Sequence, residues 1–88
     1  MFDIIILSKA KKQLLKLEKK IIEIILKKIY TIKENPLHYI ERLKDVPSWK
    51  LRIGDYRAIY EIKESEKKII ILYIGHRDDV YDDFSKLY

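Results

Sequence analysis

The sequence predicts an α+β domain in which two helices pack against a small, mostly antiparallel sheet of four strands. Apolar or alternating residues indicate strands at 2–7, 49–53, 56–62 and 69–74. A long stretch with helical periodicity separates the first of these strands from the second. The resulting order, βααβββ followed by a short C-terminal helix, is typical of helices that cover one face of a sheet.

The first half of the chain supplies the first strand and the helices. Residues 2–7 are almost entirely apolar, so we expect a strand that is buried on both faces or nearly so. From Lys9 the apolar residues recur at helical spacing, and a second apolar stripe continues to the Asn35-Pro36 pair, where a helix has to end. Neither Gly nor Pro marks a turn between the two stripes. A pair of antiparallel helices is therefore favoured, with a single kinked helix as the alternative.

The second half supplies the rest of the sheet. Residues 36–48 connect the helices to the next strand, and within them the stretch 39–43 is open to a loop, a brief strand or a helical turn. Residues 63–68 are charged or Ser and predict a solvated loop. The continuous apolar run 69–74 predicts a strand at the centre of the sheet, and residues 80–84 indicate a short helix.

Length and composition favour one compact domain over residues 1–88, because a chain of this size has room for a single core. The absence of cysteine excludes disulfides and thiolate metal sites, and the two histidines, His38 and His76, are far apart. We therefore expect no metal and no cofactor. The apolar N-terminal run is too short for a signal peptide or a membrane span, so we expect a cytoplasmic protein.

The net charge of +5 is compatible with a polyanionic partner such as RNA. The excess lies in residues 1–44, where 11 Lys and Arg stand against 5 Asp and Glu. A chain with 38% charged residues, rich in Lys and Glu, also fits selection for heat stability. Charge alone does not separate these two explanations.

The most informative stretch is residues 49–60. Two alternating arms flank Gly54-Asp55, which predicts a hairpin with a two-residue type II′ turn. A two-residue turn determines the register, so Arg52 is expected opposite Arg57, with Lys50 on the same face. Opposed like charges destabilise a sheet by about 0.2–1 kcal/mol. Alternating charges often form a solvated hairpin face, but two opposed arginines favour a bound anion.

These residues carry a resemblance to a known family. The chain resembles the RelE/ParE superfamily of toxins, and within it the RelE-type mRNA interferases of prokaryotic type II toxin–antitoxin systems. The resemblance covers essentially the whole chain and rests on two motifs: Leu51-Arg52-Ile53-Gly54-Asp55-Tyr56-Arg57-Ala58-Ile59-Tyr60 and, some fifteen residues later, Gly75-His76-Arg77. It implies a RelE-like fold, a toxin that cuts mRNA in the ribosomal A site, and neutralisation by a cognate RelB-like antitoxin.

The resemblance also implies roles for particular residues. Basic residues on the sheet of RelE proteins bind RNA phosphates and stabilise the transition state, and they correspond here to Lys50, Arg52, Arg57 and Arg77. A tyrosine near the C-terminus positions the substrate or shuttles a proton, and Tyr81 is its counterpart, at a spacing about two residues shorter than in well-known members.

Two further positions qualify this correspondence. Where the family often has a second basic residue, this chain has Ser48, which weakens the expectation of full activity. Some related toxins use a C-terminal His as an acid, which makes His76 a candidate. Strand-end histidines and part-buried tyrosines are also common without any catalytic role.

The chemistry expected of these residues needs no metal. The RNA 2′-OH attacks the adjacent phosphate while cations stabilise the developing charge and an acid protonates the leaving oxygen. Arg57 and Arg77 suit charge stabilisation, Lys50 is a candidate base, and Tyr81 or His76 is a candidate acid. Two alternatives remain: a ParE-like toxin that inhibits DNA gyrase without cutting RNA, and an inactive toxin that only binds its antitoxin.

Overall fold

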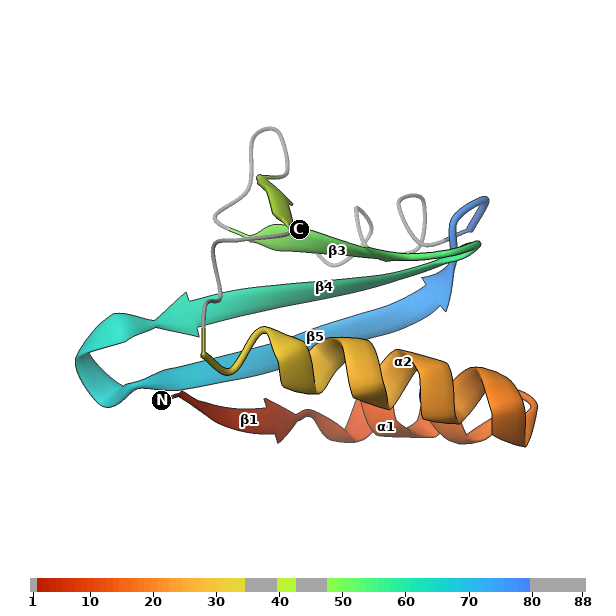
Figure 1. The fold of residues 1–88 in the computed structure, drawn as a ribbon, viewed down its shortest axis with the longest axis horizontal. Helices are drawn as coiled ribbons and strands as arrows, with labels where there is room; N and C mark the ends of the chain where they lie inside the picture. Colours follow the sequence, from red (N-terminus) through yellow and green to blue (C-terminus); the bar gives the residue numbers. More distant parts are fainter. Residues whose placement is uncertain (1, 35–39, 43–47, 80–88) are drawn as a thin grey trace.

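The computed structural model describes residues 2–34, 40–42 and 48–79, and these form two helices and a five-stranded mixed sheet (Figure 1). In chain order the elements are β1 (Asp3–Ile6), α1 (Ser8–Leu15), α2 (Lys19–Thr31), β2 (Ile40–Arg42), β3 (Trp49–Ile53), β4 (Tyr56–Lys63), a 3-10 turn (Glu64–Glu66) and β5 (Lys68–His76). The predicted C-terminal helix lies outside the described residues. No helix in these ranges is long and apolar enough to cross a bilayer.

The sheet has the strand order β1-β5-β4-β3-β2. Neighbouring strands are antiparallel except β1 and β5, which run parallel. The α+β class with two helices on a mostly antiparallel sheet is therefore confirmed. The stretch 39–43, which the sequence left open, contributes the three-residue strand β2, and this strand extends the sheet beyond the four strands predicted.

Strand β1 differs from its prediction, because it is not buried on both faces. Among the described strands it lies at the edge of the sheet and pairs with β5 alone. Ile4 and Ile6 pack against the core, whereas the side chain of Ile5 is 37% exposed. The helices cover only one face, so an apolar run at the edge is buried on that face alone.

The helical segment forms two helices rather than one kinked helix. The first ends at Leu15, and the backbone N–H groups of Lys16 and Leu17 bond to carbonyl oxygens three residues earlier, which tightens the last turn. The second helix begins at Lys19 and ends at Thr31, four residues before the Asn35-Pro36 pair. The charged segment after Leu17 therefore reverses the chain without Gly or Pro.

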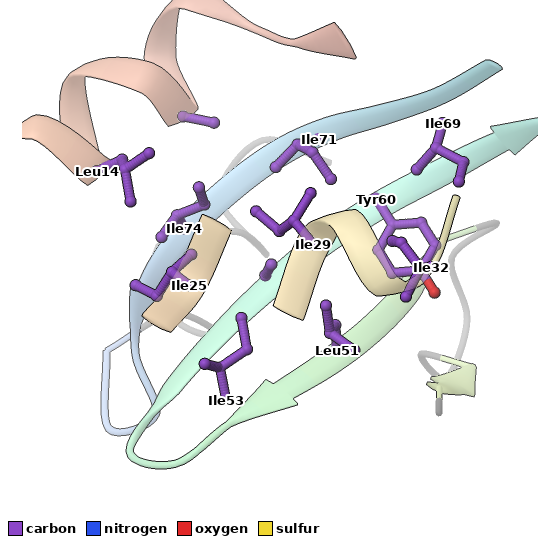
Figure 2. Close-up of a cluster of buried hydrophobic side chains, with 12 residues drawn as sticks. Leu14, Ile25, Ile29, Ile32, Leu51, Ile53, Tyr60, Ile69, Ile71 and Ile74 are labelled. Carbon is purple, nitrogen blue, oxygen red and sulfur yellow. The ribbon is translucent and has the colours of Figure 1, made fainter. Parts of the chain in front are cut away.

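The core lies between the helices and one face of the sheet (Figure 2). As the alternation in the hairpin predicts, Leu51, Ile53, Ala58 and Tyr60 are buried in it, and Tyr56 packs against it. Residues of both helices and of β5 complete the cluster: Ala10, Leu14, Ile25, Ile29, Ile32, Ile69, Ile71 and Ile74. All the strand residues of this cluster point toward the helices, so the opposite face of the sheet presents the residues that alternate with them.

Strand β5 contains a β-bulge midway along its pairing with β4. Ile59 pairs with Tyr73, but the next residue, Tyr60, pairs with Ile71, so that Leu72 is an extra residue in β5. The bulge shifts the alternation of β5 by one residue. Ile71 and Ile74 therefore both face the helices although they are three residues apart.

Candidate functional site

The predicted hairpin is confirmed residue by residue. Ile53 pairs with Tyr56, and Arg52 pairs with Arg57, which leaves Gly54 and Asp55 as the turn. Gly54 has a φ of +58°, and among the described non-glycine residues only Lys67 has a positive φ. A positive φ at the first turn residue followed by a negative φ is the pattern of a type II′ turn, as expected.

The register brings three cations together on the face of the sheet that the helices do not cover. We call this surface the basic face and define it by Lys50, Arg52 and Arg57. Arg52 is exposed and Lys50 is partly buried. Arg57 is only 7% exposed, so its charge lies in a less aqueous environment than that of Arg52, where electrostatic interactions are stronger.

Arg57 also holds the turn. Its Nη1 atom donates hydrogen bonds to the carbonyl oxygens of Gly54, at 2.6 Å, and Tyr56, at 2.7 Å. Both bonds are short and involve a charged donor, which is the stronger class of hydrogen bond. The two bonds fix the plane of the guanidinium beside the turn, so Arg57 is ordered without a ligand.

Arg77 lies at the same end of the sheet. Strand β5 pairs with β4, and the N–H of Arg77 donates to the carbonyl oxygen of Asp55 in the turn at 2.8 Å. The Arg77 side chain is 57% exposed, and its Nε lies 3.9 Å from a carboxylate oxygen of Asp55 and 3.8 Å from one of Asp78. Exposed ion pairs of this length are weak, so this guanidinium can exchange its partners for a phosphate.

His76 lies on the other face. It pairs with Tyr56, and the two rings meet edge to face with their centroids 5.6 Å apart. Its Nδ1 accepts a hydrogen bond from the N–H of Asp78 at 3.2 Å. Arg57 pairs with Gly75, so the sheet separates the His76 ring from the Arg57 guanidinium. The structure therefore does not bring this candidate acid to the basic face.

Two other positions from the sequence have different outcomes. Tyr81 lies outside the described residues, so its role stays a prediction. Ser48 is fully buried just before β3, and therefore a longer basic side chain at this position would have to displace its neighbours.

Three residues near this surface were not identified from the sequence. The backbone of Glu41 in β2 lies opposite that of Lys50. Gln13 accepts a hydrogen bond through Oε1 from the N–H of Ile74 at 2.9 Å, and Lys9 places its Nζ 5.5 Å from the centroid of the Tyr73 ring. The only signal for the last two is their spacing of four residues, which puts them on one side of α1.

Comparison with known proteins assigns the family. The model of the ParE toxin of the type II toxin–antitoxin system parDE matches residues 4–81. No curated protein sequence matches the chain. The fold is similar to that of RelBE2, a toxin–antitoxin complex from Mycobacterium tuberculosis, with a TM-score of 0.78 at 23% identity, covering 86% of this chain and 98% of that one.

Two other solved structures show the same likeness. The archaeal RelE–RelB complex from Pyrococcus horikoshii has a TM-score of 0.76 at 24% identity and covers 86% of this chain and 94% of that one. A mutant of the E. coli toxin RelE in the free state has a TM-score of 0.75 at 25% identity, with 98% and 96% covered. The chain thus belongs to the ParE toxin family of type II toxin–antitoxin systems, within the RelE/ParE superfamily.

Proposed function

We propose that this toxin is a ribosome-dependent mRNA endonuclease that cleaves without a metal ion and inhibits translation. The observation that carries the proposal is the pairing of Arg52 with Arg57 on the face that the helices leave uncovered, with Lys50 beside them. Two opposed arginines cost stability in a sheet, and a bound phosphate removes that cost. Arg77, at the turn, adds a fourth cation at the same end of the sheet.

The geometry supports a division of roles among these cations. Arg57 is held by its two bonds to turn carbonyls, so it provides a preorganised charge for the transition state of phosphate attack. Arg77 is more exposed and suits binding of an adjacent phosphate oxygen. Lys50 is the candidate base for the 2′-OH, and Tyr81 is the candidate acid, because His76 lies on the other face.

The proposed macromolecular partners follow from the same surface. The mRNA in the ribosomal A site supplies the phosphates, and a RelB-like antitoxin neutralises the toxin in the resting state. Solved complexes of RelE with RelB have a toxin chain that is similar to this one in fold. An antitoxin segment that carries acidic side chains complements Lys50, Arg52 and Arg77 and competes with RNA for them.

The test adds the purified toxin to translating ribosomes and maps mRNA 5′ ends by primer extension. We expect cleavage within the A-site codon by the wild type, and a loss of about 100-fold or more in Lys50→Ala and Arg77→Ala, as for other single groups that stabilise a transition state. Lys11→Ala on α1 is the matched control, because it removes an exposed lysine far from the turn. Equal cleavage by all four proteins would reject the roles assigned here.

The family match favours a second candidate, inhibition of DNA gyrase, since the matching model describes ParE toxins. Intact mRNA in the ribosome assay, together with blocked supercoiling in a gyrase assay, would support it. Inactivity in both assays together with tight antitoxin binding would identify an inactive toxin that only binds its antitoxin. Ser48, which is buried at a position that is often basic in the family, favours this outcome.

A further inference from the structure

Helix α1 takes the place of β1 as the neighbour of β5. The pairing of β1 with β5 ends at Ile6 and Ile71, and the N–H of Leu7 adds one more bond to the carbonyl oxygen of Ile71 at 3.1 Å. Beyond this point the edge of β5 is met by the helix, where Gln13 Oε1 accepts the N–H of Ile74 at 2.9 Å (Figure 1). These bonds fix one side of α1 along the edge of the strand.

That side of the helix carries a lysine at the rim of the basic face. Tyr73 pairs with Ile59, which lies on the same face of β4 as Arg57 two residues away, so the Tyr73 ring is on the basic face. The Nζ of Lys9 lies 5.5 Å from the centroid of this ring, within the range of a cation–π contact. The ammonium group of Lys9 is therefore held at the edge of the basic face, beside β5.

Two more lysines follow Lys9: Lys12 in α1, and Lys16, which caps the C-terminus of the helix with helical backbone angles. Each residue of an α-helix turns by about 100°, so Lys12 and Lys16 lie within about 60° of Lys9 around the axis, whereas Lys11 lies about 160° away. All four are exposed, and residues 8–16 contain no Asp or Glu. We call Lys9, Lys12 and Lys16 the lysine stripe.

We propose that the lysine stripe extends the basic face onto α1 and binds the phosphates of the RNA strand on which the toxin acts. The inference rests on the proposed function, because it identifies the surface that binds the RNA strand beyond the phosphates held by Arg52 and Arg57. Tyr73 is only 5% exposed, so its ring holds Lys9 but does not stack on a base. Contacts between ammonium groups and phosphates do not depend on the base sequence.

The test measures binding without cleavage. A short single-stranded RNA with 2′-O-methyl groups, which removes the attacking hydroxyl, is titrated with toxin by fluorescence anisotropy at several KCl concentrations. A protein that neutralises one phosphate fewer loses about 0.7 from the slope of log K against log salt on a single strand. We expect this loss in Lys9→Ala and a larger one in the Lys9→Ala, Lys12→Ala double variant.

Lys11→Ala is the matched control, with the same charge change on the same helix, and we expect it to retain the wild-type slope. The inference is overturned if Lys9→Ala and Lys11→Ala have equal slopes, or if the wild type does not bind this RNA. Ribosomal cleavage is scored separately in the same proteins. If the wild type does not cleave but Lys9→Ala has a smaller salt slope than Lys11→Ala, the proposed function is rejected and the lysine stripe is retained as an RNA-binding surface. If the wild type cleaves fully but the two slopes are equal, the lysine stripe is rejected and the proposed function is retained.

Discussion

Replacing Arg57 with alanine is expected to destabilise the protein far more than replacing its cross-strand partner Arg52. The reason is structural, because Arg57 is 7% exposed and bonds through Nη1 to the carbonyl oxygens of Gly54 and Tyr56. Arg52 is exposed, so its removal takes away little packing and relieves the repulsion between the two guanidinium groups.

The size of the effect follows from these contacts. A hydrogen bond to a charged group contributes about 1.5–3 kcal/mol, and the lower value applies here because the carbonyl oxygens of an exposed turn regain water. Two such bonds give about 3 kcal/mol, and relief of the pairing with Arg52 returns about 0.2–1 kcal/mol. The net loss of about 2–3 kcal/mol corresponds to a fall of about 8–24 °C in Tm for a domain of this size.

Urea and thermal unfolding of the wild type, Arg57→Ala, Arg52→Ala and the double variant measure this directly. We expect Arg52→Ala to lower the free energy of unfolding by less than Arg57→Ala does. Because each single change relieves the same repulsion, we expect the double variant to lose more stability than the sum of the two single losses. A fall in stability for Arg57→Ala that is no larger than for Arg52→Ala would refute the assignment of Arg57 to the turn. A double-mutant cycle without a repulsive coupling would refute the charge argument for an anion site.

Two further predictions concern α1 and the core. Gln13→Leu leaves the N–H of the buried Ile74 without its acceptor, so we expect the free energy of unfolding to fall by about 1–3 kcal/mol and the amide hydrogen of Ile74 to exchange faster. Gln13→Glu keeps an acceptor oxygen, so we expect it to retain most of the protection of that amide from exchange. Equal exchange rates at Ile74 in the two variants would contradict this role of Gln13. Burial raises the pKa of the Tyr60 hydroxyl above its ordinary value of about 10. The tyrosine therefore loses its proton at a lower pH in the unfolded chain than in the folded one. Below pH 10 this group leaves the free energy of unfolding unchanged, and above pH 10 it makes that free energy fall as the pH rises. In Tyr60→Phe we expect a smaller fall in the free energy of unfolding at alkaline pH, measured by urea unfolding.

Local physical rules explain why the hairpin could be predicted from sequence. A two-residue loop with Gly54 first has one favoured turn type, and that turn leaves one register for Arg52 and Arg57. The apolar and polar alternation then separates the core face from the basic face without any knowledge of the rest of the chain. The placement of Arg77 beside the turn needed one further step, the pairing of β5 with β4.

The features that the sequence did not predict depend on contacts between distant segments. The exposure of Ile5 follows from the edge position of β1, which its apolar run does not reveal. The bond from Ile74 to Gln13 joins residues 61 positions apart. β2 was left open because it has three residues and gains its partners only from β3. Tyr81 lies beyond the described residues, so sequence alone carries its assignment.

The bulge at Leu72 determines which residues in the second half of β5 face the helices and which lie on the basic face. With the extra residue, Tyr73 and Gly75 lie on the basic face, and His76 lies beneath it beside Tyr56. In an unbulged strand that kept the pairing of Tyr60 with Ile71, the odd and even positions beyond it would exchange faces, and Ile74 rather than Gly75 would lie opposite Arg57. The bulge therefore determines that a glycine, and not a bulky apolar side chain, lies opposite Arg57 on the basic face.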